Sequence, residues 1–387
     1  MSRLKRVAEH PATQRALRSS FARRVTTQLV AAQRAPEDVV TPYAGWAALE
    51  REGAAPLTPR AATAQLDVAI VVPGFRRGSG GHTTIANLVR GLERRGHTCS
   101  IWIDDPLHQS GGAANFSAFF GPFNARVHDD LTHWTGAQVV LATGWQTVAT
   151  VLRLQNTGAR AHLVQDDEPE FYPASAERLW AQQAFQLPTI TAGTWLAERM
   201  REKGLPATPF DLGIDHATYR PQPHIARRTN EVLFYARTAT PRRAVPLGLL
   251  ALEELKRRRP RTEVVLFGDA APLAVPYTNL GILTEQQVAD AYAQAAVGVV
   301  LSLTNHSLAA QEMAACALPA VELRTPSTEA AFKDGPIVLA PPTVRGLADA
   351  IEAQLDAPRT DVEWARTRTW ERAAAAVEAG LRAAVEA

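Results

Sequence analysis

Cysteine is scarce in this chain, since only Cys99 and Cys316 occur among its 387 residues. Both stand inside apolar segments, so neither a disulfide framework nor a metal site built on several cysteines is expected. Cysteine usage of this kind is typical of a reducing compartment, and we predict a cytoplasmic location.

The sequence also lacks an uninterrupted apolar run long enough to span a membrane, and its first residues lack the apolar core and cleavage site of a secretory signal. Its formal net charge is only +2, so no field of one sign marks the whole chain as a nucleic-acid binder. We therefore expect a soluble protein without a nucleic-acid partner, or one held peripherally on the inner face of the cell membrane.

Basic residues concentrate in residues 1–62, which we interpret as a helical extension and a linker. Leu17, Phe21, Val25 and Leu29 recur at helical spacing with arginines between them, and several prolines follow. The predicted amphipathic helix could lie on an anionic lipid surface or pack onto the main body of the protein. The pattern leaves both alternatives open.

From Asp67 onward, short β-branched runs alternate with helical segments, which predicts parallel, doubly wound sheets. Strands are expected at Asp67–Val72, Cys99–Ile103, Gln138–Leu141, His162–Val164, Pro188–Thr191, Glu231–Tyr235, Glu263–Phe267, Val297–Leu301, Pro319–Leu323 and Ile337–Leu339. The length favours two domains, and we place them at residues 63–222 and 223–357, followed by a C-terminal helix at 358–387.

A glycine-rich turn follows the first expected strand and opens a helix over Gly78–Gly96. Thr83 stands where the dinucleotide-binding fingerprint requires its third glycine, so binding of NAD is disfavoured. The chain has no phosphate-loop Gly-Lys-Ser/Thr, and the spacing of its histidines fits no zinc pattern.

Four stretches, in this order, resemble the retaining family-4 glycosyltransferases of the GT-B type. They are Gly78–Gly96, Thr194–Pro221, Tyr235–Arg242, and the stretch from Leu280 through Glu312 to Pro319. Within that family the chain is most similar to the WsaF-like rhamnosyltransferases, on the Arg237-x-x-x-Pro241-Arg242 form of the arginine motif, the Gly80-Gly81-His82 turn and the Gln165–Tyr172 segment.

The resemblance implies an α/β protein of GT-B fold, in which two Rossmann-like domains face a central cleft. A helical N-terminal extension and a C-terminal crossing helix would complete it. The C-terminal domain would hold a nucleotide-sugar donor and the N-terminal domain a glycan or lipid-linked glycan acceptor. The implied reaction moves a deoxysugar, L-rhamnose from dTDP-L-rhamnose, to an acceptor hydroxyl with retained configuration.

Arg237 and Arg242 are the predicted catalytic cations, since a diphosphate leaving group gains negative charge as the glycosidic bond breaks. Two permanent cations near the end of a strand could neutralise that charge. Arg243 is a rival for the role of Arg242, and this arginine-rich chain also allows the alternative that both are surface residues.

Donor binding is predicted for residues of both domains. Glu312 could accept hydrogen bonds from ribose hydroxyls. The resemblance assigns the backbone amides of Ser307 and Leu308 to the phosphates. It assigns the turn Gly281–Leu283 to the base. Small residues allow close approach of backbone amides in the first domain, where Gly80 and Gly81 are the candidates.

The sequence departs from the family pattern at Thr304, where many family-4 enzymes carry a second glutamate near the transferred sugar. This departure bears on the identity of the sugar more than on nucleotide binding, and a 6-deoxysugar with fewer polar groups would tolerate it.

Acidic residues after the strand at His162–Val164 are the candidates on the acceptor side. Asp166 and Asp167 are predicted catalytic residues, with Glu168 and His82 as acceptor-binding residues. The two aspartates could instead ligate Mg²⁺. Arginines and helix dipoles can replace a metal in two-domain enzymes, so we expect neither a metal nor any other cofactor.

Two other functions stay open at this level. A sugar-nucleotide epimerase of the same fold would convert the donor without an acceptor. A catalytically inactive protein that binds a glycan or nucleotide sugar would bind the donor without turnover, an alternative that the threonine at position 304 favours.

Overall fold

The computed structural model describes residues 40–61, 63–271 and 273–387. The predicted basic helix through Leu17 and Leu29 lies outside these residues. Residues 45–387 belong to one compact unit. The first helices that the structure describes are the short helix η1 (Thr41–Tyr43) and helix α4 (Ala44–Glu52). Among the described helices, none combines the length and apolar character needed to cross a bilayer.

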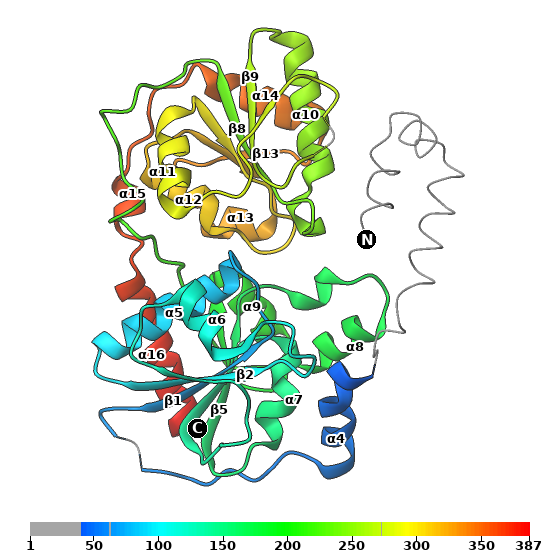
Figure 1. Ribbon diagram of the computed structural model, residues 1–387, viewed down its shortest axis with the longest axis vertical. Coiled ribbons are helices and arrows are strands. Elements are labelled where there is room, and N and C mark those ends of the chain that lie inside the picture. The colour runs from blue at the N-terminus through cyan, green and yellow to red at the C-terminus, as the bar shows by residue number, and fades with distance from the viewer. Residues whose placement is uncertain (1–39, 62, 272) are drawn as a thin grey trace, which may run out of the picture. The chain divides into compact units, whose positions relative to one another are not determined.

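A parallel sheet forms the first α/β half (Figure 1). Its strands are β1 (Asp67–Pro73), β2 (Thr98–Asp104), β3 (Arg126–His128), β4 (Ala137–Ala142), β5 (Thr157–Val164), β6 (Thr189–Ala192) and β7 (Ala207–Phe210). The spatial order is β3-β2-β1-β4-β5-β6-β7, so the chain reverses its direction across the sheet between β1 and β4. Ligands of doubly wound folds bind outside the carboxyl ends of the strands at such a reversal.

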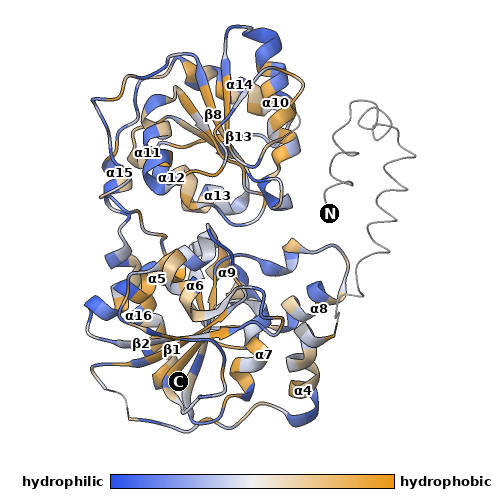
Figure 2. Ribbon diagram, in the orientation of Figure 1, coloured by the Kyte–Doolittle hydropathy of each residue, from blue (hydrophilic) through white to orange (hydrophobic). Residues whose placement is uncertain are grey.

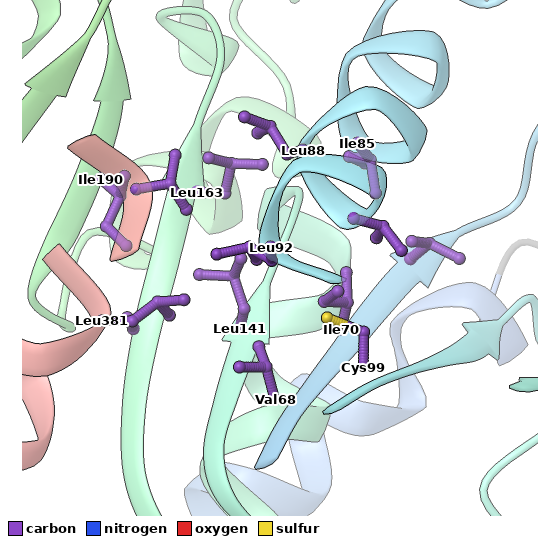
Figure 3. Packing of buried hydrophobic residues seen from close by; sticks show 14 of the residues in the cluster. Val68, Ile70, Ile85, Leu88, Leu92, Cys99, Leu141, Leu163, Ile190 and Leu381 are labelled. Atoms are coloured by element: carbon purple, nitrogen blue, oxygen red, sulfur yellow. The ribbon is translucent and has the colours of Figure 1, made fainter. Parts of the chain in front are cut away.

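Helices connect these strands and cover the sheet. They are α5 (Gly80–Arg94), α6 (Gly112–Phe120), α7 (Trp145–Arg153), η2 (Glu168–Phe171), α8 (Ala176–Gln183) and α9 (Thr194–Glu202). Figure 3 shows the core beneath α5, where Ile85, Leu88 and Leu92 pack onto strand residues such as Ile70 and Leu141. Alternate residues of each strand point to one face, so these strand side chains share the face that α5 covers.

A second parallel sheet forms the other half, in the order β10-β9-β8-β11-β12-β13. Its strands are β8 (Glu231–Ala236), β9 (Glu263–Gly268), β10 (Thr278–Asn279), β11 (Val297–Val299), β12 (Ala320–Leu323) and β13 (Val338–Ala340). The central strands such as β8 and β11 are largely apolar, while the covering helices carry polar residues (Figure 2). A doubly covered parallel sheet requires this distribution.

The second sheet is covered on both faces, with a separate apolar cluster on each. The helices of this half are η3 (Pro241–Arg243), α10 (Val245–Arg258), α11 (Glu285–Gln294), α12 (Leu308–Ala315), α13 (Pro326–Ala331) and α14 (Val344–Leu355). Leu252 of α10 and Ile351 of α14 lie in one cluster, whereas Tyr292 of α11 and Met313 of α12 lie in the other. The direction of the chain reverses between β8 and β11.

The C-terminal segment returns to the first sheet. After α15 (Glu363–Arg366), the long helix α16 (Trp370–Glu386) packs its Val377 and Leu381 into the core of that sheet. Gly91 of α5 lies so close to Ala374 that a side chain there would collide with it. The structure thus contains a C-terminal helix that crosses from the second half to the first, as the sequence resemblance implies.

The expected strands match β1, β2, β4, β5, β6, β8, β9, β11, β12 and β13 to within a few residues. Three short strands were not predicted, and all of them lie at sheet edges: β3, β7 and β10. Helix α9 has Gly193 at its N-cap position, and Thr194 is its first helical residue.

Candidate active site

The carboxyl ends of β8 and β11 lead into two adjacent loops at the reversal point of the second sheet. The loop after β8 carries Arg237 and the helix η3, and the loop after β11 carries Leu303 and Thr304. The backbone amide of Leu303 donates to the carbonyl of Arg242 at 2.9 Å, which ties the two loops together. Residues far apart in sequence therefore share one edge of the sheet, where an anionic ligand is expected.

Arg242 is held by residues of the first half. Its Nε lies 3.1 Å from Oδ2 of Asp166, and its guanidinium carbon lies 4.0 Å from the centroid of the Phe171 ring. Burial of the guanidinium lowers the pKa of Arg242, although the neighbouring carboxylate opposes this shift. The predicted cation and the predicted catalytic aspartate thus form one ion pair.

Arg237 differs from Arg242 in its surroundings. Its Nη1 lies 3.5 Å from the carbonyl oxygen of Gly78, in the turn that precedes α5. Among the residues described, no carboxylate lies within ion-pair distance of Arg237. This cation is consequently available to an anionic ligand.

Arg243, the alternative to Arg242 as a catalytic cation, takes part in a hydrogen-bond network with two buried residues. Its Nη1 donates to Oγ of Ser302 at 2.5 Å, and Ser302 in turn donates through its backbone amide to Oε1 of Glu322 at 2.7 Å. Glu322 is fully buried, and burial raises its pKa to about 7. The structure therefore gives Arg243 a positioning role beneath the loop that follows β11.

Asn305 is a residue of this loop whose role the sequence did not reveal. Its Nδ2 donates to the carbonyl oxygens of Gln165 at 2.8 Å and Ala192 at 2.9 Å, both in the first half. Its Oδ1 accepts from Oγ of Ser327 at 2.7 Å, and its backbone amide donates to Oδ1 of Asp166 at 2.8 Å. One buried side chain thus joins the loop to both halves.

The acidic residues Asp167 and Glu168, which follow β5, are held by an ion pair and a hydrogen bond. Oδ2 of Asp167 lies 2.7 Å from Nη2 of Arg199, and burial raises the pKa of the Asp167 carboxyl. Oε2 of Glu168 accepts from the amide of Trp145, at the start of α7, at 2.6 Å. Burial raises the pKa of Glu168 to about 7 despite this bond. The roles predicted for these acidic residues in catalysis and acceptor binding stay predictions.

His82 lies in the first turn of α5 and is almost completely buried. Its Nδ1 lies 2.8 Å from Oγ of Ser79, and its Nε2 lies 3.4 Å from the carbonyl oxygen of Pro73. Burial lowers the pKa of the imidazole to about 4, so the ring is neutral at physiological pH. Through these two contacts His82 connects the start of α5 to Ser79 and to the end of β1. Its predicted contact with the acceptor stays a prediction.

The glycine and helix-start residues predicted to bind the donor lie at two helix N-termini. Gly80 and Gly81 form the first residues of α5. Ser307 caps α12 by accepting from the amide of Ala309 at 3.1 Å, and Leu308 packs onto the core of the first sheet. Both helix ends present amides and a positive dipole, which suit phosphate oxygens.

The turn predicted to bracket the base precedes α11. Gly281 adopts a φ of +67°, which glycine tolerates without strain, and Leu283 packs partly onto the cluster beneath α11. Ile282, between them, is 88% exposed. The turn therefore offers an uncovered apolar side chain next to the predicted base-binding residues.

Glu312 lies on α12 and is only partly exposed. Burial, with added repulsion from Glu285 and Asp215, raises the pKa of its carboxyl to about 8. The ligand-free carboxyl is consequently protonated at neutral pH, and it can both donate to and accept from a hydroxyl.

We expect the stability of the protein to reveal this shifted pKa of Glu312. The unfolded chain releases this proton near the ordinary value of 4.5 and the folded protein only near 8, so the native state binds more protons between these values. Stability must then fall as pH rises through that window. Glu312→Gln should lose less thermal stability than wild type between pH 5 and pH 8. Equal losses in melting temperature would contradict the assignment.

A cavity of about 490 Å³ lies beside Arg242. Its walls come from η2, the start of α9, η3 and the loop after β11. Sequence reasoning did not single out five of its lining residues: Glu170, Phe171, Trp195, Arg199 and Leu303. Aromatic and arginine residues just after the carboxyl ends of β5 and β6 were the available signal.

Among the described residues, no group of three or more histidine, cysteine or acidic side chains is placed to hold a metal ion. Asp166 and Asp167, which could have shared a cation, face Arg242 and Arg199 instead. The expectation that catalysis proceeds without a metal stays a prediction.

Two Rossmann-like halves and a crossing C-terminal helix define the GT-B class, and solved structures support this fold. One is AviGT4, a glycosyltransferase involved in avilamycin A biosynthesis, at a TM-score of 0.57 and 15% identity over 83% of this chain and 98% of that one. Another is HepE from Anabaena in complex with UDP and glucose, at 0.52 and 12% identity over 83% and 97%. A protein of Listeria monocytogenes named as a UDP-N-acetylglucosamine 2-epimerase gives 0.54 and 14% identity over 82% and 96%.

The sequence comparisons point to a particular group within this class. Residues 230–352 match the family model described as the C-terminal domain of WsaF. An O-antigen biosynthesis protein, RfbC of Myxococcus xanthus, is 28% identical over 232 residues, which are 57% of this chain and 18% of that protein. This chain therefore spans less than a fifth of that relative's length. Together these matches confirm the resemblance to WsaF-like glycosyltransferases and the GT-B fold.

Proposed function

We propose that this chain is a glycosyltransferase that moves L-rhamnose from dTDP-L-rhamnose to a hydroxyl of a glycan or lipid-linked glycan, with retention. The observation that carries the proposal is the position of Arg237 at the reversal point of the second sheet. It lies there without a carboxylate partner among the residues described, against the turn that opens α5. A nucleoside diphosphate leaving group requires an available cation of this kind.

Thr304 supports a deoxysugar as the transferred group. Its side chain is buried at the wall of the cavity, and its hydroxyl has no hydrogen-bond partner in the described part of the chain. Leu303 and Pro241 give the same wall an apolar surface. A 6-deoxysugar presents a methyl group where other hexoses carry a hydroxyl. Leu303 and Pro241 suit that methyl, and a ring hydroxyl of the sugar can pair with the Thr304 hydroxyl.

The proposed chemistry is a front-face displacement. The bond between the anomeric carbon and the diphosphate oxygen breaks while the acceptor oxygen bonds to that carbon from the same face. The departing phosphate oxygen takes the acceptor proton, so no separate strong base is needed. Arg237 and the N-terminal amides of α12 stabilise the charge that develops on the diphosphate.

The acceptor and the location of the protein are proposed from the name of a relative. The named role of the Myxococcus xanthus relative in O-antigen biosynthesis favours a surface polysaccharide or its lipid-linked precursor as acceptor. Assembly from a nucleotide sugar would place the reaction in the cytoplasm, with the inner face of the membrane as the peripheral site.

A nucleotide screen tests the donor assignment. At a ligand concentration of 100 Kd, a nucleotide that binds only the folded protein adds about 2.7 kcal/mol of stability. We expect dTDP to raise the melting temperature of the full chain more than UDP, GDP or ADP at equal concentration. An absence of any shift would contradict the proposal, and conversion of dTDP-L-rhamnose to another sugar nucleotide without acceptor would indicate an epimerase.

A further inference from the structure

We propose that Glu322 is a positioning residue for the transfer reaction, because its ionised carboxylate fixes the two loops that carry Arg237 and Thr304. This inference rests on the proposed function, and it adds the buried group that makes the reaction depend on pH near neutrality. Glu322 lies in β12, is fully buried and does not line the cavity beside Arg242, so it must act through other residues.

The Glu322 carboxylate accepts three hydrogen bonds at the end of β12. Its Oε1 accepts from the backbone amides of Ser302 at 2.7 Å and Leu323 at 2.8 Å, and its Oε2 accepts from Oγ of Ser302 at 3.1 Å. The Ser302 hydroxyl in turn accepts from Nη1 of Arg243 at 2.5 Å. One carboxylate therefore holds the loop after β11 directly and the loop after β8 through Ser302.

The loop after β8 connects Arg243 to Arg237 by two successive turns. The amide of Arg243 donates to the carbonyl of Thr240 at 2.9 Å, and the amide of Thr240 donates to the carbonyl of Arg237 at 3.0 Å. The amide of Leu303, which follows Ser302, donates to the carbonyl of Arg242 at 2.9 Å. A shift of Arg243 or Ser302 is thus passed to the proposed phosphate-binding cation and to the wall of the cavity.

The charge on Glu322 decides whether this arrangement is satisfied. An ionised carboxylate only accepts hydrogen bonds, so the Ser302 hydroxyl can give its hydrogen to Glu322 and accept from Arg243. A protonated carboxyl carries a hydrogen of its own, and the Ser302 hydrogen then competes with it. Arg243 also loses its counter-charge. A buried polar group left without a partner is costly, so the loops should rearrange when Glu322 gains a proton.

The surroundings of Glu322 place this change of charge near neutral pH. Burial raises the pKa of its carboxyl to about 7, although the Leu323 amide, Arg243 and Ser302 favour the ionised form. The residue opposite it on β13 is the uncharged Leu339, and the helices packed on β12, α12 and α14, turn apolar residues inward. Burial lowers the pKa of His306, which lies near Arg243, to about 3, so this ring stays neutral.

Glu322→Gln removes the charge and keeps the shape of the side chain. Glu231→Gln is the matched control, because Glu231 is also a buried carboxylate of the same sheet, and its pKa is likewise raised by burial. It pairs with Arg228 at 2.9 Å and begins β8, at the opposite end of the strand from Arg237. Ser302→Ala is a second test variant, which removes the hydroxyl that links Glu322 to Arg243.

The rate of transfer from dTDP-L-rhamnose would be measured from about pH 5 to pH 9. In wild type and Glu231→Gln we expect the rate to rise through an inflection near the Glu322 pKa of about 7. Glu322→Gln should lower the rate by about 10–100-fold, the effect of a small misplacement of catalytic groups, and should lose the inflection. Glu168 has a pKa of about 7 as well. An inflection that survives in Glu322→Gln would assign it to Glu168 and overturn the inference.

Thermal stability separates this role from a purely structural one. The native state binds more protons than the unfolded chain between the ordinary glutamate pKa of 4.5 and about 7, so wild type loses stability as pH rises through that window. Glu322→Gln should lose less stability over the same range while transferring sugar more slowly. A residue needed only for the fold would lower transfer in step with stability.

Hydrogen exchange of the ligand-free full chain, followed by mass spectrometry, tests the loops without any substrate. Peptides covering residues 237–244 and 301–305 should lose protection in Glu322→Gln and Ser302→Ala and keep it in Glu231→Gln. Unchanged protection in both test variants would overturn the inference. A wild type that is neither stabilised by dTDP nor able to transfer sugar would instead count against the proposed function.

Discussion

Arg237→Ala should lower the rate of sugar transfer by about 10²–10³-fold, the effect expected when one preorganised group that stabilises transition-state charge is removed. The reason is its availability, since no carboxylate among the described residues lies within ion-pair distance of this guanidinium, whose Nη1 contacts the carbonyl oxygen of Gly78 at 3.5 Å. Removal leaves no buried group uncompensated, so the melting temperature of the ligand-free protein should change little.

The measurement is the rate of transfer from dTDP-L-rhamnose, together with the dTDP-induced rise in melting temperature. Arg257→Ala serves as the control, because this arginine on α10 has a 71% exposed side chain and pairs with Glu254 one turn away. We expect the control to retain both activity and dTDP stabilisation. Near-normal transfer by Arg237→Ala would remove this residue from the site.

Arg242 illustrates why the two predicted cations are not equivalent. Its ion pair with Asp166 is partly buried, so truncation would leave a carboxylate without its cation, and breaking such a pair typically costs about 3–5 kcal/mol of stability. A loss of activity in that variant could reflect the fold as much as the chemistry. Arg237 therefore gives the cleaner test of charge stabilisation.

Much of the fold could be predicted because buried parallel strands leave a strong local signal. β1 and β4, for example, are apolar runs buried on both faces of the sheet. The edge strands gave no such signal. β3 has three residues and β10 has two, and β7 includes Pro209, so their pairing depends on neighbours that the local sequence does not specify.

The candidate site was predictable only where one segment carries the chemistry. The glycines at the start of α5 and Glu312 within α12 could be placed from their own segments. The Asp166–Arg242 pair joins residues from different sheets, and the cavity is formed by four separate segments. Asn305 looked like an ordinary loop residue, since its partners Gln165 and Ala192 become neighbours only after both halves have folded.

Asn305→Ala should reduce the free energy of unfolding by about 2–6 kcal/mol. The Asn305 amide donates to two carbonyl oxygens at 2.8 and 2.9 Å, and its side-chain oxygen accepts from Ser327 at 2.7 Å. Each buried polar group left without its partner costs about 1–3 kcal/mol, and the Gln165 and Ala192 carbonyls would both lose a donor. Denaturant unfolding followed by fluorescence and circular dichroism measures the loss.

Asn305→Asp separates hydrogen bonding from simple loss of volume. The new carboxyl has nearly the shape of the amide, but when ionised it turns an acceptor toward the same two carbonyl oxygens, and the Asp166 carboxylate lies close by. It should therefore be less stable than Asn305→Ala at neutral pH, although it leaves no cavity, and it should recover some stability in mild acid as the carboxyl gains a proton to donate. Asn115→Ala is the control, because Asn115 makes a side-chain bond to the Ser110 carbonyl at 3.0 Å within the first half. If the alanine variant proved the less stable of the two at neutral pH, packing rather than the donated bonds would be the contribution of Asn305.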